Sequence, residues 1–173
     1  MRRTSDDLPK PNKVVRLRKY HSENLIPMFR KAAKLRNEML EEGFTDNGGA
    51  IHSAERILDV LGLHLKYPSL SHINNLRHYR GAKFSTKAWA AHKAGRRVMI
   101  EHVSPIRDFT RKAIDKIVQG KSSEQLKNFV SFVRKSYQLV LLTPGETRCL
   151  NKQNRSKMIG DRLGRAGIKM AKR

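Results

Sequence analysis

Apolar residues recur with a helical period through the first half of the chain. In segments 25–40 and 51–65 they fall three or four positions apart, which is the spacing of an amphipathic helix with one buried face. Residues 47–49 are turn-forming and separate the two segments, so we expect the two helices to form a hairpin. Shorter patterns of the same kind over 69–80 and 85–95 predict two more helices.

The second half of the chain combines helical periods with two short apolar runs. The runs 98–103 and 139–142 are bounded by turn residues, which is typical of buried strands. Between them, segments 106–120 and 122–133 have the helical period. Thr143-Pro-Gly-Glu146 then has the pattern of a capping box and predicts the start of another helix. We therefore expect a mainly α protein with a small two-stranded sheet.

The composition indicates one domain with basic ends. A length of 173 residues suits a single compact domain that buries a core. Residues 1–20 combine two prolines with seven Lys and Arg, which is typical of a flexible basic leader. We expect a single mostly helical domain over 21–159. Glycines alternate with cations over 160–173, which predicts a loose basic tail.

The charge of the chain indicates its class of partner. There are 37 Lys and Arg against 15 Asp and Glu, a formal net charge of +22. Because such an excess repels itself in a compact fold, we expect a polyanionic partner, DNA or RNA, whose counterions are released on binding. An acidic protein is an alternative partner. A membrane is not expected, because no apolar run approaches the roughly 20 residues that span a bilayer.

Cysteine usage and the N-terminal sequence indicate the compartment. Cys149 is the single cysteine, so the chain has no internal disulfide and no Cys-rich zinc site. This is typical of a reducing compartment, and we expect Cys149 to be a small core residue. The basic N-terminal segment lacks the apolar middle of a secretory signal. These features favour a cytoplasmic protein.

One short segment could support catalysis. Glu101-His102-Val103-Ser104-Pro105 places a carboxylate beside an imidazole where a predicted strand meets a turn. The carboxylate could bind a metal ion while the imidazole takes a proton from water. Because side chains alternate across a strand, both reach one site only if the strand ends or bends there. Phosphate-binding glycine loops, His-Glu-x-x-His and cysteine pairs are absent from the sequence.

The same segment resembles a known family. Residues 101–105 resemble the Asp-His-hydrophobic-x-Pro segment of HNH, or ββα-metal, nucleases, and 138–143 resembles their Asn-Leu-Val-Leu-Leu strand. The resemblance covers about 97–158 and implies a degenerate ββα-metal core with a two-helix insertion between the strands. It implies that His102 is the general base and that Glu101 is a ligand of Mg²⁺ or another divalent ion.

The resemblance also implies roles for three amides. Gln138 would replace the Asn that positions the loop of the base. Thr147 and Arg148 stand where the family's last His or Asn falls, so Asn151 or Asn154 would complete the metal site.

Several cations would then hold the phosphate backbone; they are Arg96, Arg97, Arg148, Lys152, Arg155 and Lys157. Two functions fit the sequence: a metal-dependent endonuclease, or an architectural, ribosome-associated or regulatory protein that binds DNA or RNA without cutting it. The oligomeric state stays open.

Overall fold

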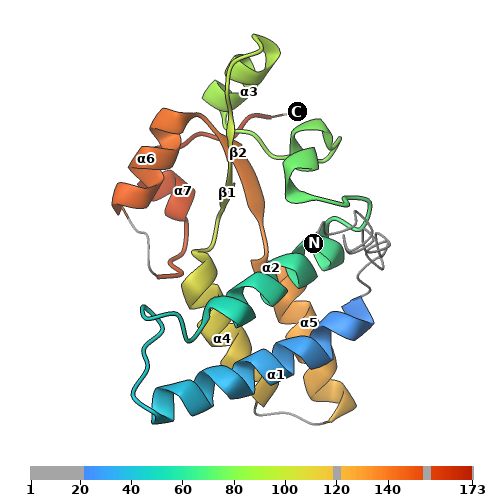
Figure 1. Cartoon of the computed structure of the whole chain (residues 1–173). Helices are drawn as coiled ribbons and strands as arrows, with labels where there is room; N and C mark the ends of the chain where they lie inside the picture. Colours follow the sequence, from blue (N-terminus) through green and yellow to red (C-terminus); the bar gives the residue numbers. More distant parts are fainter. Residues whose placement is uncertain (1–21, 119–121, 154–156, 173) are drawn as a thin grey trace, which may run out of the picture.

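The computed structural model describes residues 22–118, 122–153 and 157–172 (Figure 1). The predicted leader therefore lies outside the described residues. Two helical hairpins form the lower part of the molecule in Figure 1, which we call the helical lobe. Its helices are α1 (Ser22–Glu41), α2 (His52–Lys66), α4 (Ile106–Val118) and α5 (Ser123–Ser136). The hairpin predicted from residues 25–65 is thus confirmed.

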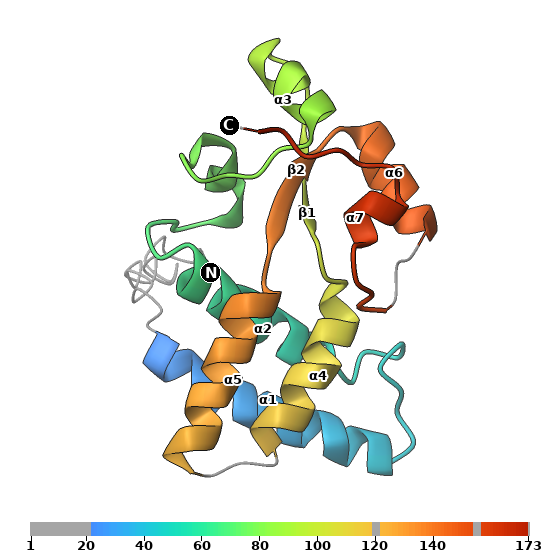
Figure 2. The ribbon, with the colours of Figure 1, turned by 180° about the vertical axis from the view of Figure 1, so that it is seen from behind.

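The upper part, which we call the sheet lobe, is built from the described residues of the segments 68–102 and 138–172. Its centre is an antiparallel pair of strands, β1 and β2, and short helices surround their upper ends (Figure 2). The elements are the 3₁₀ helix η1 (Ile73–His78), α3 (Thr86–Lys93), β1 (Met99–His102), β2 (Leu139–Leu142), α6 (Pro144–Gln153) and α7 (Arg162–Arg165). The mainly helical fold with a two-stranded sheet is as predicted.

The register of the sheet gives each strand two different environments. Ile100 pairs with Leu141 and His102 with Leu139, and this face of the sheet packs on the main core shared with the helical lobe. The other face carries Glu101 opposite Val140 and packs toward α6 and α7. Neighbouring residues of β1 therefore point into different parts of the molecule.

Local sequence signals set the start of α6. The backbone N–H and hydroxyl of Thr143 both donate to Glu146 Oε2, at 2.9 and 3.0 Å, and Glu146 N–H returns a bond to Thr143 Oγ1 at 3.3 Å. These bonds form the predicted capping box, with Pro144 at the first helical position. Glu146 also accepts a bond from Ser85 Oγ at 2.6 Å, which ties α6 to the start of α3.

The expectation of a loose tail over 160–173 is wrong for the residues that the structure describes there. Residues 169–171 pair with the strand-like segment 84–86, because Thr86 N–H donates to Lys169 O and Ala171 N–H donates to Phe84 O. Ile168 is buried in the small core beneath α6. A few apolar residues thus anchor a segment whose composition is mostly basic.

Two further properties follow from the described residues. Cys149 is exposed on α6, so the expectation of a core cysteine is wrong. Among the helices of 22–118, 122–153 and 157–172, none has both the length and the apolar character needed to cross a membrane.

Candidate nucleic-acid interface

His102 faces the helical lobe and belongs to a partly buried polar cluster. Its Nε2 lies 3.0 Å from Asp59 Oδ1, and the hydroxyl of Tyr137 donates to the same oxygen at 2.7 Å. Burial would raise the pKa of Asp59, but the bonds from His102 and Tyr137 outweigh it and the pKa is lowered. Burial raises the pKa of Tyr137, and the Asp59 charge adds to the rise. The cluster joins α2 to β1 and to the C-terminal end of α5.

Glu101 lies on the opposite face of β1. It shares that face with Val140, next to the small core of α6 and α7, while His102 is packed beside Tyr137. Burial raises the pKa of Glu101, and a hydrogen bond from Thr147 and the charges of His102 and Arg162 offset part of the rise. The strand does not bend between the two residues, so the predicted site that combines Glu101 with His102 does not form.

A buried guanidinium lies between the residues expected to hold the metal. Arg162 is 4% exposed and donates to the carbonyls of His102 and Val103 at 2.9 and 3.3 Å. It also donates to Asn151 Oδ1 at 3.3 Å, and it interacts electrostatically with Glu101. A permanent cation therefore stands beside both predicted ligands. The residues do not fit a divalent metal ion, because that ion would meet the positive charge of Arg162.

The remaining candidates of the catalytic site are also apart. The side chain of Gln138 donates to Lys135 O at 3.1 Å, while its main-chain carbonyl accepts a bond from Val103 N–H. Gln138 therefore does not orient the His102 ring through its amide. Asn154 and Arg155 lie outside the described residues. In the part of the chain that the structure describes, no three His, Cys, Asp or Glu side chains group together as metal ligands would.

The candidate cations occupy a strongly basic lobe. The two segments of the sheet lobe hold 15 Lys and Arg but only 3 Asp and Glu. All three acids are engaged: Glu101 lies near Arg162, Glu146 caps α6, and Asp161 accepts a bond from Gly164 N–H at 3.0 Å. Little negative charge is left to neutralise the exposed cations of this lobe.

Five of these cations line three adjoining hollows, and we call them the basic band. One hollow lies between α3 and α6, a second between η1 and α3, and a third between α6 and α7. Arg96 and Arg97 line both the first and the second, and Lys87 lines both the first and the third, so the surface is continuous. The band consists of Arg77, Lys87, Arg96, Arg97 and Arg148.

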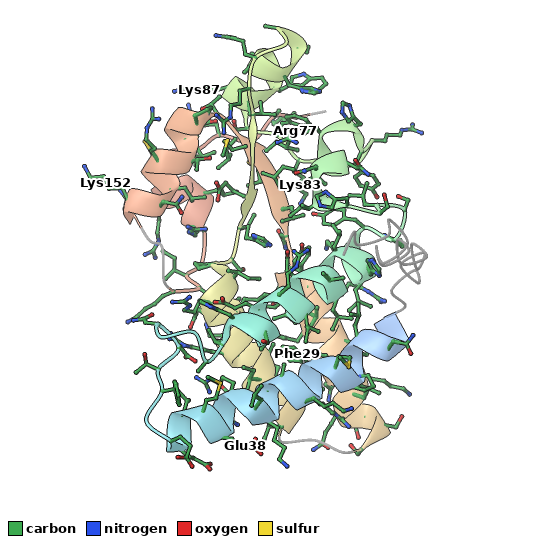
Figure 3. The ribbon with its side chains drawn as sticks, in the orientation of Figure 1. Phe29, Glu38, Arg77, Lys83, Lys87 and Lys152 are labelled. Atoms are coloured by element: carbon green, nitrogen blue, oxygen red, sulfur yellow. The ribbon has the colours of Figure 1, made fainter. Side chains whose placement is uncertain are left out.

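The cations of the band are accessible to a ligand. Lys87, Arg96, Arg97 and Arg148 are exposed, and among the described residues no carboxylate lies within ion-pair distance of them. Arg77 is held near Val98, whose carbonyl accepts from its Nη2 at 3.5 Å. Figure 3 places Lys87, at the start of α3, and Arg77, from η1, near the upper ends of the strands. Cations from four separate elements and turns thus meet on one surface.

The band agrees only in part with the candidates named from the sequence. Arg96, Arg97 and Arg148 belong to it, whereas Lys152 is exposed near the C-terminal end of α6 (Figure 3). Lys157 is exposed at a position beyond that helix. Arg77 and Lys87 were not among the candidates. Neither has a motif of its own, but a charge count by segment would have indicated the acid-poor lobe that contains both.

Comparisons with protein-family models, with curated proteins and with solved structures find no match for this chain.

Proposed function

We propose that the protein binds nucleic acid through the basic band and that this binding does not depend on a metal site at His102. The observation that carries the proposal is the set of exposed cations in adjoining hollows that form no ion pairs among the described residues; the carboxylate that lines one of these hollows, Glu146, is already bonded to Thr143 and Ser85. Exposed Lys and Arg without partners gain most from meeting phosphates, because each contact releases condensed counterions. Several elements supply the cations of the band, so the band is extended, as a phosphate backbone is.

The geometry around His102 favours binding without cleavage. Asp59 and Tyr137 engage His102 on one face of the sheet, and the predicted ligand Glu101 lies on the other. To act as a general base in metal-dependent hydrolysis, a ring nitrogen of His102 would have to lie within hydrogen-bond distance of a metal-bound water. With Arg162 next to Glu101 and Asn151, we assign these residues to holding the lobe together and not to hydrolysis.

The proposal is tested by removing charge from the band and, separately, from the helical lobe. The band variant is Lys87→Gln/Arg96→Gln/Arg97→Gln, and the matched control is Lys31→Gln/Lys127→Gln/Arg134→Gln, which removes three exposed cations far from the band. We expect the band variant to bind labelled duplex DNA, single-stranded DNA and RNA at least about tenfold more weakly in mobility-shift titrations. The control should stay within about threefold of the wild type.

A cleavage assay on the same samples tests the catalytic part. Wild type and His102→Ala are incubated with each nucleic acid in Mg²⁺, in Mn²⁺ and in EDTA. We expect binding with no cleavage in any condition. Metal-dependent cleavage that His102→Ala abolishes, while the variant still folds and binds, would overturn the assignment and restore the nuclease.

A further inference from the structure

A group of aromatic rings lies beside the basic band. The ring of His92, on α3, is centred 5.1 Å from that of Phe84 and 6.1 Å from that of Trp89, with the last pair inclined by 30°. His78, from η1, lies 6.4 Å away. Phe84 is 2% exposed and anchors the group in the main core. His92 is therefore a partly exposed ring on a rigid aromatic base.

His92 lines the hollow between η1 and α3. The other walls of this hollow, of about 480 Å³, include Arg77 from η1 and Arg96 and Arg97 from the turn before β1. One wall thus carries a planar ring, and three guanidinium groups surround it. Both kinds of group stack on nucleobases, and the guanidinium groups also bind phosphates.

Trp89 is a weaker candidate for contact with a ligand. The ammonium of Lys93 lies 5.6 Å from the centre of its ring, and the ring packs against Phe84 and the main core. His92, and not the tryptophan, lines the hollow. Trp89 is instead a reporter, because it is the single tryptophan of the chain and lies next to His92.

We propose that this hollow accepts an unpaired nucleobase, stacked on His92, with the neighbouring phosphates held by Arg96 and Arg97. The inference rests on the proposed function and adds a preference for single-stranded nucleic acid. In a duplex the faces of the bases are covered by their neighbours, so only the phosphates reach the band. In a single strand a base can turn out of the stack and offer its face to an aromatic ring.

The test measures binding of the full chain to oligo(dT), oligo(dU), oligo(U) and a DNA duplex of equal length. We expect at least one of the single strands to bind about tenfold more tightly than the duplex, and to change the fluorescence of Trp89 on binding. Because thymine also carries a methyl group that uracil lacks, the ratio of the oligo(dU) and oligo(U) affinities, which compares strands that differ only in the sugar, tells whether DNA or RNA is preferred.

Two substitutions separate stacking from charge and from folding. His92→Ala should weaken single-strand binding about tenfold and leave duplex binding nearly unchanged, whereas His92→Phe, which keeps a ring, should retain single-strand binding. Far-ultraviolet circular dichroism checks that both variants fold. Equal affinity of the wild type for single strands and duplex, or equal single-strand affinity of wild type and His92→Ala, would overturn the stacking inference. The proposed function would survive either result as long as the band variant still loses binding.

Discussion

The two lobes use their charges differently. In the helical lobe, residues 22–67 and 103–137 hold 14 Lys and Arg and 10 Asp and Glu, and charged pairs cross between its helices and loops. Arg36 and Arg111 meet on Asp46, and Arg107 bonds Glu55. In the sheet lobe the three acids already interact with other groups of the lobe. Exposed cations of the basic band therefore line hollows and form no ion pairs with carboxylates among the described residues. Charge stabilises the fold in one lobe and is available to a ligand in the other.

Arg162 is an exception to this difference between the two lobes. It belongs to the sheet lobe, yet it is buried and bonded to β1 and α6. Its role in stability should therefore resemble that of the charges in the helical lobe.

The largest expected loss of stability comes from Arg162→Met. The substitution removes the donors to His102 O and Asn151 and takes away a positive charge that interacts with the half-buried Glu101. We expect the free energy of unfolding, measured by urea titration, to fall by about 3 kcal/mol. Arg165→Met, at an exposed position of the same helix, should change it by less than about 0.5 kcal/mol. Similar small effects of both would show that Arg162 is not a structural cation.

Asp46→Asn tests the paired charges of the helical lobe. Bonds from Arg36 first and Arg111 second lower the pKa of Asp46 from 3.8 to about 2. Because the pKa is lower in the folded state, this contribution is full above pH 4 or so and is lost as the pH falls toward 2; it amounts to about 2 kcal/mol. Urea titrations from pH 2 to 6 should show a shallower pH dependence for Asp46→Asn than for the wild type. Glu42→Gln, at an exposed position, should follow the wild type, and parallel curves for all three would contradict the assignment.

Tyr137→Phe tests the junction of the two lobes. It removes the hydroxyl that donates to Asp59, an acceptor shared with His102. A hydrogen bond to a charged group contributes more than a neutral one, so we expect a loss of about 1.5 kcal/mol in urea titration with the fold preserved. No measurable loss would mean that His102 alone satisfies Asp59.

The smallest effect on stability is expected from the band variant Lys87→Gln/Arg96→Gln/Arg97→Gln. These side chains are exposed and have no carboxylate partners in the described part of the chain, so the free energy of unfolding should change by less than about 0.5 kcal/mol. Thermal or urea unfolding without nucleic acid provides the measurement. A loss above 2 kcal/mol or so would show that the band is part of the fold and would weaken its assignment to a ligand.

Local signals in the sequence predicted the elements well. The run 139–142 is β2, and Thr143 with Glu146 forms the capping box, because both depend on neighbouring residues. Side chains alternate between the two faces of a strand, so the sequence alone already places Glu101 and His102 on opposite faces of β1. The two residues were predicted to share one site only because the strand was assumed to end or bend there. The resemblance to HNH nucleases favoured that assumption.

Contacts between distant residues could not be predicted in this way. His102 meets Asp59 from 43 positions away, and Arg162 reaches His102 across 60 positions. Neither partner carries a local pattern that identifies the other. The basic band depends on distant contacts in the same way: a charge count indicates a basic region, but four separate segments supply the cations of the band and only the fold brings them to one surface.

The salt dependence of binding tests the central claim most directly. The affinity of the wild type for a preferred oligonucleotide is measured between about 50 and 200 mM salt, with the band variant and the control variant of Lys31, Lys127 and Arg134 alongside. Each lost phosphate contact lowers the slope of log affinity against log salt concentration by about 0.7 to 0.9, so the band variant should lose about 2 to 3 from the slope while the control matches the wild type. Equal losses of slope in the two variants would contradict a localised interface and would show that the net charge of +22 acts as a whole.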